Sequence, residues 1–385
     1  MERIIHKNSL ILIILLTMIA STIFYLNTMK ANYTVEESEE QFIKEFNPDY
    51  IPDEKIISQK TNIYPKTPEL KGIAGYINTN ETLRISNLKG KVVLVDFWTY
   101  TCINCIRTLP YIKNWHEKYE DEGLVIIGVH TPEFEFEKKL QNVKDAINKH
   151  ELKYPIVQDN NYATWRAFNN MYWPHKFLID IDGFIRYDHI GEGQYDTTEL
   201  VIQELLNEKK QREGNQKFIS KDISEPVETI EIDLGKVKTP EIYFGYQFAR
   251  GNFGNERGLK RNTIIEYNIP ETINFNNAYL EGSWETNKDG SKLLSEKGKI
   301  ILQYNAKFLN IVASSEEEIE LEILVDGRPL NNNNKGSDVE ITDKKSIAKI
   351  QKSKLYNLIN FDYNIHTIEI DINGKGFEIF TFTFG

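Results

Sequence analysis

The chain has 385 residues, of which 40% are hydrophobic, and it carries a net charge of −11 at pH 7. This length exceeds what a single hydrophobic core usually serves, and it predicts two domains. The acidic balance and the lack of a basic patch argue against a nucleic-acid-binding protein.

The first thirty residues have a composition of their own. An uncharged stretch, 9–26, follows Arg3 and Lys7 and precedes Lys30. It is just long enough to cross a bilayer, and the positive charges before it predict a cytoplasmic N-terminus with the bulk of the chain outside. Residues 1–30 are therefore expected to form a single transmembrane helix that anchors the protein in the cell membrane. The alternative is a cleaved signal peptide, which would make the protein secreted.

The next two regions differ in their hydrophobic pattern. Residues 31–68 are polar with scattered prolines and are predicted to form a tether. Residues 69–210 alternate between strand and helix patterns. A short hairpin is expected over 75–85, and the continuous apolar run 92–98 is typical of a strand covered on both faces. An Asp-Gly pair at 182–183 predicts a second hairpin, and together these elements predict a three-layer α/β domain.

The last part of the chain has no helical periodicity. Residues 211–226, rich in Lys, Glu and Gln, are predicted to be a linker, and residues 227–385 an all-β domain. Short strand-like runs separated by turn signals are typical of an antiparallel sandwich or jelly roll. The clearest runs are 299–304, 308–313, 319–325, 367–372 and 377–384.

Cys102 and Cys105 are the only cysteines of the sequence, and they closely follow the strand-like run 92–98. A structural metal site usually needs four ligands, and neither a second cysteine pair nor suitably spaced histidines accompany this pair. We therefore expect no metal and no cofactor. A disulfide between these residues would close too small a loop to stabilise the fold through chain entropy. Reversible thiol–disulfide chemistry is the favoured interpretation, with an inert pair or a weak metal site as the alternative.

The position of the pair suggests a role for each cysteine. The sequence passes here from a strand to a helical pattern, so Cys102 is expected at a helix N-terminus, where unpaired N–H groups and the helix dipole favour a thiolate. We assign Cys102 as the nucleophile and Cys105, one turn deeper, as the resolving thiol. Asp96 stands within the apolar run, where a carboxylate is costly. We expect it to accept or relay the proton of Cys105; a strand-end carboxylate that reaches solvent or a lysine is the alternative.

Residues 95–105 resemble the active-site segment of thioredoxin, with Asp96 six residues before the first cysteine. Pro110 matches the proline inside the thioredoxin active-site helix. Pro174, preceded by Trp173, matches the cis-proline that faces the disulfide in that family. The resemblance implies a thioredoxin-like fold for this domain and a place for Pro174 in the active site. It also implies that the proline loop binds the extended chain of a client protein.

A narrower resemblance covers roughly residues 70–385. The chain is similar to the extracytoplasmic part of DipZ-type proteins, in which a TlpA-like thioredoxin domain precedes a sandwich that resembles carbohydrate-binding modules. Such proteins also carry a multi-span, CcdA-like membrane domain, whereas we expect one span at most in this chain. The resemblance therefore implies a separate membrane electron donor of the CcdA kind. The segments that carry it are 98–105, 128–134, 172–174, 239–246, 280–284, 325–329 and 382–385.

Three side chains are assigned to client binding. Trp98 lies shortly before the cysteine pair, and Trp173 precedes the matched cis-proline. Glu133 follows the strand-like run 124–130, and open α/β sheets place their binding sites beyond the ends of such strands. A charged loop end without a function is the alternative for Glu133.

The leading hypothesis is a membrane-anchored, extracytoplasmic thiol:disulfide oxidoreductase that reduces disulfides in client proteins. Two cysteines confined to one motif suit an oxidising compartment, because no other thiol is left to mispair. The alternative enzyme is a peroxiredoxin-like thiol peroxidase with an antioxidant role. Thr99, three residues before Cys102, is in keeping with such a site, but Val95 stands where a proline is expected.

A hypothesis of another class is a module that binds glycan or cell-wall material, with the redox domain secondary. Tyr243, Tyr279, Trp284 and Tyr304 could stack on sugar rings. Aromatic residues of a β-sandwich more often belong to its core, and we favour that interpretation.

Overall fold

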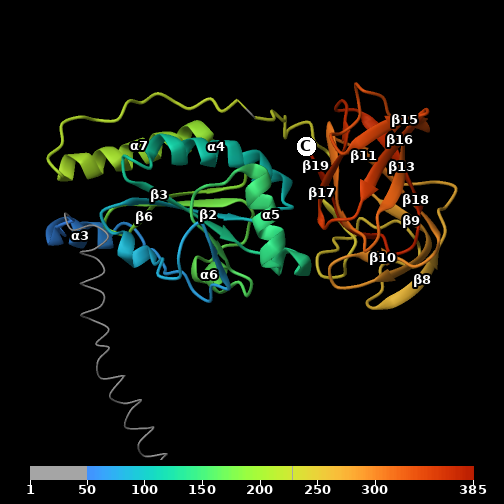
Figure 1. Ribbon diagram of the computed structural model, residues 1–385, viewed down its shortest axis with the longest axis horizontal. Helices are drawn as coiled ribbons and strands as arrows, with labels where there is room; N and C mark the ends of the chain where they lie inside the picture. Colours follow the sequence, from blue (N-terminus) through green and yellow to red (C-terminus); the bar gives the residue numbers. More distant parts are fainter. Residues whose placement is uncertain (1–49, 228) are drawn as a thin grey trace, which may run out of the picture.

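The computed structural model describes residues 50–227 and 229–385. The expected anchor or signal segment, residues 1–30, lies outside these ranges. Within the described ranges, none of the helices combines the length and the hydrophobicity that a membrane crossing requires. Two domains lie side by side, with the chain's C-terminus between them (Figure 1).

The first domain is built on a six-stranded sheet with the strand order β1-β4-β3-β2-β5-β6. The three central neighbours β4, β3 and β2 run parallel, and the pairs β1–β4, β2–β5 and β5–β6 run antiparallel. The strands are β1 (Gly75–Ile77), β2 (Val92–Trp98), β3 (Leu124–His130), β4 (Ile156–Gln158), β5 (His175–Ile179) and β6 (Ile185–Ile190).

Helices cover both faces of this sheet, which confirms the predicted three-layer α/β domain. Successive side chains of a strand point to opposite faces. Val92 and Leu94 of β2 therefore pack toward α4, α5 and α7, whereas Val93 and Val95 pack toward α6 and the short 3-10 helix η1. Figure 1 shows α4 and α7 above the sheet and α6 below it. The helices are α4 (Ile103–Tyr119), α5 (Leu140–His150), α6 (Ala163–Ala167), α7 (Tyr195–Arg212), η1 (Ile85–Leu88) and η2 (Glu135–Lys138).

Of the two predicted hairpins, one is confirmed and one is wrong. Strands β5 and β6 pair antiparallel around the Asp-Gly turn, where Gly183 has a positive φ of 85°. The hairpin expected over 75–85 does not form, because β1 pairs with β4 instead. Ile85 and Leu88 belong to η1 and insert into the core beneath the sheet.

Part of the region expected to be a tether is folded against the first domain. Helix α3 (Glu54–Thr61) begins after Asp53, whose side chain caps it. Lys60 at the end of this helix lies within 2.5–2.7 Å of three carboxylates, those of Asp180, Asp182 and Glu208. This ionic cluster joins the segment before the domain to the far end of the sheet.

The second domain is all-β and close to a barrel, with thirteen strands around one apolar core. The main path of the sheet is β15-β16-β13-β18-β11-β9-β10-β19-β12-β17, and β7, β8 and β14 pair at its side. All five clearest strand predictions are confirmed, as β11, β12, β13, β18 and β19. The strands are β7 (Ile242–Tyr243), β8 (Thr263–Tyr267), β9 (Ala278–Thr286), β10 (Ser291–Leu293), β11 (Lys297–Asn305), β12 (Phe308–Ser314), β13 (Ile319–Val325), β14 (Arg328–Pro329), β15 (Val339–Thr342), β16 (Lys345–Ile350), β17 (Lys354–Asn360), β18 (Ile365–Asn373) and β19 (Glu378–Phe384).

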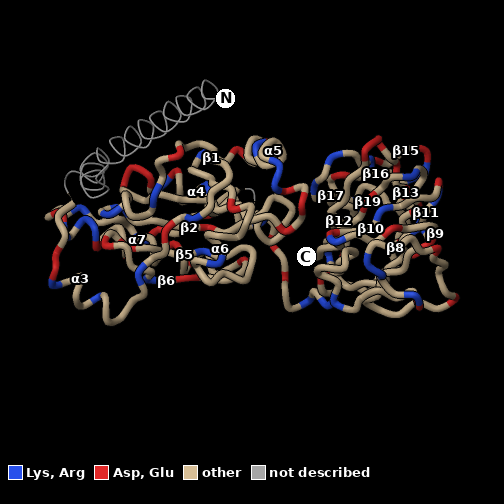
Figure 2. Tube along the Cα trace, turned by 90° about the horizontal axis from the view of Figure 1, so that it is seen from below, with Lys and Arg blue, Asp and Glu red and all other residues tan. Residues whose placement is uncertain are grey.

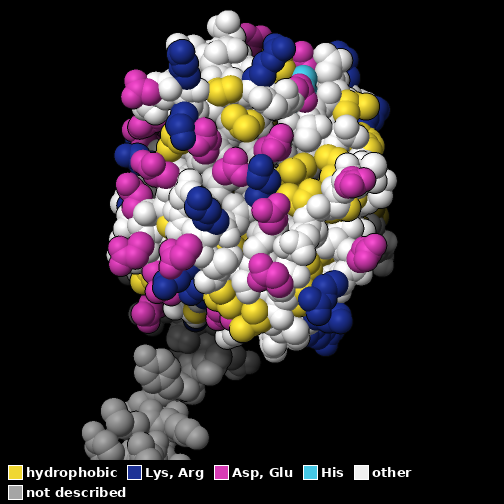
Figure 3. Space-filling model, turned by 90° about the vertical axis from the view of Figure 1, so that its right-hand side faces the viewer, with side chains coloured by type: hydrophobic (Ala, Val, Ile, Leu, Met, Phe, Trp, Pro, Cys, Tyr) yellow, Lys and Arg dark blue, Asp and Glu magenta, His cyan; other side chains and the backbone are white. Residues whose placement is uncertain are grey.

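The aromatic residues considered as a sugar platform are buried. Tyr279, Trp284 and Tyr304 are at most 1% exposed, and Tyr243 faces the first domain. The core interpretation is therefore confirmed for Tyr279, Trp284 and Tyr304, whereas Tyr243 is buried at the contact with the first domain, and none of the four can stack on a sugar in this arrangement. Figure 3 shows the outer end of the second domain, where hydrophobic side chains alternate with charged ones.

The segment between the domains crosses the outer surface of α7 and α4 (Figure 1). The carbonyl of Asp222 accepts hydrogen bonds from Lys118 of α4 and Gln203 of α7, at 2.7 and 2.9 Å. Ser224 donates its backbone N–H to Glu199 of α7 at 2.8 Å. The linker thus binds along the first domain before it enters the second.

Candidate active site

The cysteine pair lies where β2 passes into α4. Cys102 is the N-cap residue of α4, and its Sγ accepts the backbone N–H of Cys105 at 3.2 Å. Both residues are free thiols; Cys102 is partly exposed, whereas Cys105 is 1% exposed. Burial and the neighbouring Cys102 raise the pKa of Cys105 well above its usual value. The pair therefore combines an accessible sulfur with a buried one that holds its proton firmly.

Asp96 lies beneath the pair on the face of β2 that carries α4. Its side chain is 1% exposed, and Oδ1 has no hydrogen-bond partner among the described residues. Burial raises the pKa of Asp96 to about 7, against the opposing effect of the Lys176 charge. The Asp96 charge in turn contributes to the raised pKa of Cys105. The Asp96 carboxyl and the Cys105 thiol thus influence each other electrostatically.

Lys176 is a site residue that sequence reasoning missed. It lies opposite Asp96 in the β2–β5 register and is fully buried. Burial lowers its pKa, and its Nζ donates a 2.9 Å hydrogen bond to the carbonyl of Gly191. The available signal was a lysine directly before the apolar residues 177–179 of β5, but its partner depends on the register between two strands that are distant in the sequence.

The proline loop lies at the start of β5. The Trp173–Pro174 peptide bond is cis, as the resemblance implied. Because His175 pairs with Phe97 in the β2–β5 register, Pro174 stands at the end of β2, next to the cysteine loop. Trp173 is partly exposed, and its indole donates to the Thr131 carbonyl at 3.0 Å. This loop remains the candidate surface for the client chain.

The loop also exposes two apolar side chains. Met171 is 72% exposed and Tyr172 is 49% exposed. They precede Trp173 directly, so three adjacent residues present apolar surface beside the proline.

Trp98 is not part of that surface, and its assignment to client binding was wrong. Its side chain is fully buried under α4 and meets the His130 ring edge-on at 5.3 Å. His130 is also fully buried, and burial lowers its pKa to about 3. The sequence did not reveal this burial, because Trp98 lies only four residues before Cys102 along the chain.

Glu133 contacts the second domain rather than an open groove. Tyr243 donates its hydroxyl to Glu133 Oε1 at 2.7 Å, and Glu241 lies on the other side of that hydroxyl at 3.1 Å. Burial, and then the charge of Glu241, raise the pKa of Glu133 to about 8. Glu133 thus has a contact between the domains that was not predicted, and its assignment to client binding stays a prediction.

Apolar rings extend this junction beside the active site. Phe380 of β19 lies 4.7 Å from the ring of Phe136 and 5.3 Å from that of Phe134. Tyr100, two residues before Cys102, donates its hydroxyl to the Ser353 carbonyl at 3.3 Å. The second domain thus forms one side of the catalytic face, which sequence reasoning did not anticipate.

Arg107 joins the active-site helix to the loop after β6. It is 5% exposed and forms two 2.8 Å hydrogen bonds with Glu192, one from Nε and one from Nη2. Its Nη2 also bonds to Asn104, between the cysteines. These contacts fix the first turn of α4 relative to the rest of the sheet.

The described residues include one group of acids that is close enough to hold a cation: Asp180, Asp182 and Glu208. Lys60 already lies against all three. Arg186 and Arg212 add further ion pairs. This ionic cluster is neutralised by protein side chains and offers no argument for a metal.

Comparison with known proteins matches both domains. Residues 66–188 match the AhpC/TSA family, and residues 239–385 match the thioredoxin-like C-terminal domain family. The chain is 38% identical to protein DipZ of Mycobacterium tuberculosis over 266 residues, which is 68% of this chain and 36% of DipZ. The chain thus spans about a third of the length of its DipZ relatives.

Shorter proteins match the first domain alone. Thiol-disulfide oxidoreductase YkuV of Bacillus subtilis is 28% identical over 141 residues, which is 37% of this chain and 94% of YkuV. A solved thioredoxin-like protein in the oxidised form is 28% identical and covers 38% of this chain and 97% of its own, with a TM-score of 0.35. The chain is therefore similar to part of DipZ over both domains and to a thiol-disulfide oxidoreductase over its first domain.

Proposed function

We propose that this protein is a membrane-anchored, extracytoplasmic enzyme that reduces disulfides in client proteins. The observation that carries the proposal is the pairing of a partly exposed thiol at the N-cap of α4 with a buried thiol one turn later, above Asp96. Such a pair can attack a disulfide with one sulfur and release the product with the other.

In the first step, the Cys102 thiolate attacks one sulfur of the client disulfide. The client S–S bond breaks, a mixed disulfide with Cys102 forms, and the released client thiolate takes a proton from solvent. The N–H of Cys105 is already directed at Cys102 Sγ, which stabilises negative charge on that sulfur before the attack.

In the second step, Cys105 passes its proton to ionised Asp96 and attacks Cys102 Sγ. The mixed disulfide breaks, the second client thiolate leaves, and a Cys102–Cys105 disulfide forms. Two electrons have then passed from the enzyme to the client. We propose that a separate CcdA-like membrane protein returns them by exchanging its own dithiol for this disulfide.

The membrane assignment rests on the sequence of the N-terminal segment. The uncharged stretch 9–26 is flanked by basic residues and supports an anchor with the two domains outside the cytoplasm. Fractionation of cells, with and without external protease, tests it. The full-length protein should stay with the membrane and be digested from outside, whereas release into the medium would indicate a cleaved signal.

Reduction of insulin disulfides by the full-length protein in detergent, with dithiothreitol as the electron donor, tests the activity. Cys102→Ser should abolish turnover, and Cys105→Ser should accumulate mixed disulfides through Cys102. Turnover retained in Cys102→Ser would contradict the assignment. Peroxide consumption that needs Cys102 but not Cys105 would favour the peroxidase alternative.

A further inference from the structure

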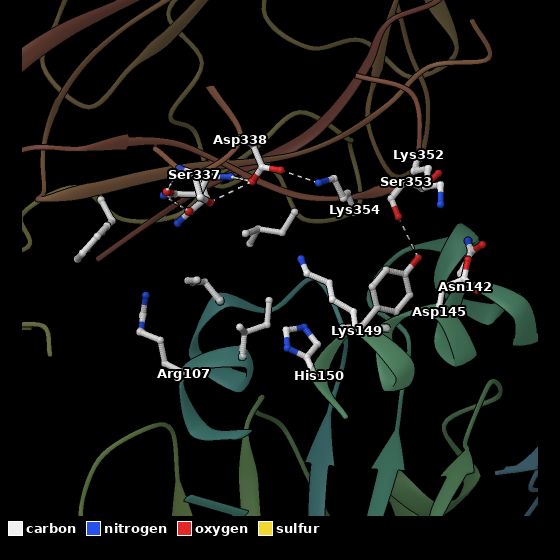
Figure 4. Close-up of a pocket in the computed structure, with 18 of the residues that line it drawn as sticks. Arg107, Asn142, Asp145, Lys149, His150, Ser337, Asp338, Lys352, Ser353 and Lys354 are labelled. Atoms are coloured by element: carbon white, nitrogen blue, oxygen red, sulfur yellow. Dashed lines mark hydrogen bonds and ion pairs between the residues drawn. The ribbon is translucent and has the colours of Figure 1, made fainter. Parts of the chain in front are cut away.

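A cleft of about 630 Å³ lies between the two domains. Its walls come from the first turns of α4, the last turns of α5, and the β12 and β17 side of the second domain. In Figure 4, Lys149 of α5 points across this cleft toward Asp338 and Lys354 on the opposite wall. The volume falls within the range of ligand sites in proteins.

The cleft begins at the active site. Ile103, which directly follows Cys102, lines it together with Ile106 and Tyr100. An extended chain advances by about 3.3 Å per residue. A polypeptide held in the cleft would therefore place its own sulfur within a few residues of Cys102.

The charge of the cleft is opposite to that of the chain. The protein as a whole carries −11 charges. Apart from His150, the lining side chains that can carry charge comprise four bases and two acids, and one of these bases, Arg107, is already paired with Glu192. Figure 2 shows basic positions in α5 and beside β17 at this junction. The charged lining residues are Arg107, Lys149, Lys352, Lys354, Asp145 and Asp338.

Two of the bases are free to meet an anion. Lys354 pairs with Asp338 at 2.6 Å, but neither Lys149 nor Lys352 has a carboxylate within salt-bridge distance among the described residues. Burial and the charge of Lys354 lower the pKa of Lys149. A bound carboxylate would offset this repulsion, so the site favours an acidic ligand.

Both walls also carry apolar side chains. Ile103 and Ile106 of α4 face the cleft from one domain, and Phe308 and Leu355 from the other. In an extended chain, successive side chains point to opposite sides. An apolar side chain of such a chain can contact the isoleucines while its acidic neighbour reaches Lys149.

We propose that this cleft binds the stretch of a client chain next to its disulfide and selects stretches that carry acidic and apolar side chains. The proposal rests on the function proposed above, because it names the kind of client that the same cysteine pair would reduce. The site lies on the side of α4 that faces the second domain, and none of its walls belongs to the proline loop.

Competing peptide disulfides test the proposal with the full-length protein, with dithiothreitol as the electron donor. Two peptides share one sequence around a disulfide and differ only in carrying either Glu or Lys near each cysteine. The wild type should reduce the acidic peptide with a kcat/KM about tenfold higher at low salt. The preference should shrink at about 1 M salt, where the screening length is about 3 Å. In the double variant Lys149→Glu/Lys352→Glu, the preference should vanish or reverse.

The matched control is Lys217→Glu/Lys260→Glu, which changes the charge equally at exposed lysines outside the cleft. It should keep the wild-type preference. Hydroxyethyl disulfide, which is small and neutral, should be reduced at similar rates by all three proteins, since it needs only the cysteines. A preference that persists in the cleft variant, or that the control also loses, would overturn the proposal. A wild type that reduces none of the three substrates would overturn the proposed function itself.

Discussion

The two domains differ in what they bury. The first domain buries a carboxylate and an amine, Asp96 and Lys176, in the layer directly beneath its cysteines. In the second domain, the buried ionisable side chains among the described residues are Asp289, whose carboxylate accepts the backbone N–H of Glu135 in the first domain, and His366. Other buried carboxylates of the first domain, such as Asp180 and Asp182, are paired with Lys60, whereas Asp96 Oδ1 has no hydrogen-bond partner among the described residues. Burying charge without a partner is costly, so this carboxylate beneath the cysteine pair indicates where the chemistry occurs. The second domain contributes walls and contacts.

The junction between the domains gives the largest expected effect on stability. Phe380→Ala removes a ring that is 4% exposed and packs on two rings of the first domain, which should cost about 3–5 kcal/mol of unfolding free energy. Denaturant unfolding measures this loss. Phe218→Ala, in the linker at 59% exposure, is the control and should cost under about 0.5 kcal/mol. Equal effects of the two variants would show that the junction does not stabilise the domain.

The next largest expected effect comes from the buried carboxylate of Asp96 and concerns the rate at which the mixed disulfide is resolved. Asp96→Asn should slow the resolution of the mixed disulfide on the order of 10²-fold, because Cys105 loses its proton acceptor. Asp96 is ionised above its pKa of about 7, so the wild-type rate should rise with pH through that value. Stopped-flow release of a fluorescent client thiol should show this rise in the wild type and not in the variant. An unchanged profile would assign the proton to another acceptor.

Glu133 predicts a smaller, pH-dependent effect at the junction. Its folded pKa of about 8 lies above the usual value of 4.5, so its stabilising contribution is complete below about pH 4.5 and is lost as pH rises through 8. Glu133→Gln keeps an acceptor for Tyr243 and cannot ionise. At pH 9 its Tm should exceed that of the wild type by about 2–4 °C for each kcal/mol recovered. Equal Tm values at pH 5 and pH 9 in the wild type would contradict this account.

Tyr100 gives the smallest effect. Tyr100→Phe removes one hydrogen bond to the Ser353 carbonyl across the junction and should cost about 1 kcal/mol or less in denaturant unfolding. Tyr119→Phe is a useful contrast, since its hydroxyl bonds to Glu199 within the first domain at 2.6 Å. A large loss in Tyr100→Phe would mean that the domains depend on this contact far more than its geometry suggests.

The features that were predicted correctly are those that local sequence patterns encode. The apolar run of β2, the helix start at Cys102 and the Asp-Gly turn are each encoded within a few residues, and all three were predicted correctly. Pro174 was placed through its resemblance to a known motif. The strands of the second domain were predicted in the same way, from strand-like runs separated by turn signals.

What the sequence did not reveal depends on contacts between distant segments. Lys176 lies opposite Asp96 only because of the register of β5 against β2. Phe380 contacts Phe136 only because one domain packs on the other. Trp98 was assigned to client binding because it lies near the cysteines along the chain, and Glu133 because it follows a predicted strand. In the structure, Trp98 is buried, and Glu133 accepts a hydrogen bond from Tyr243 of the second domain. The hairpin predicted over 75–85 does not form, because β1 pairs with β4.

Redox titration of the cysteine pair tests the central claim most directly. The protein is equilibrated in mixtures of reduced and oxidised dithiothreitol or glutathione. Its free thiols are then alkylated, and its mass is measured by mass spectrometry. The account predicts that Cys102 and Cys105 lose their alkylation sites together, in one reversible two-electron transition. Thiols that stay reduced across all biological potentials, or oxidation of Cys102 without Cys105, would contradict it.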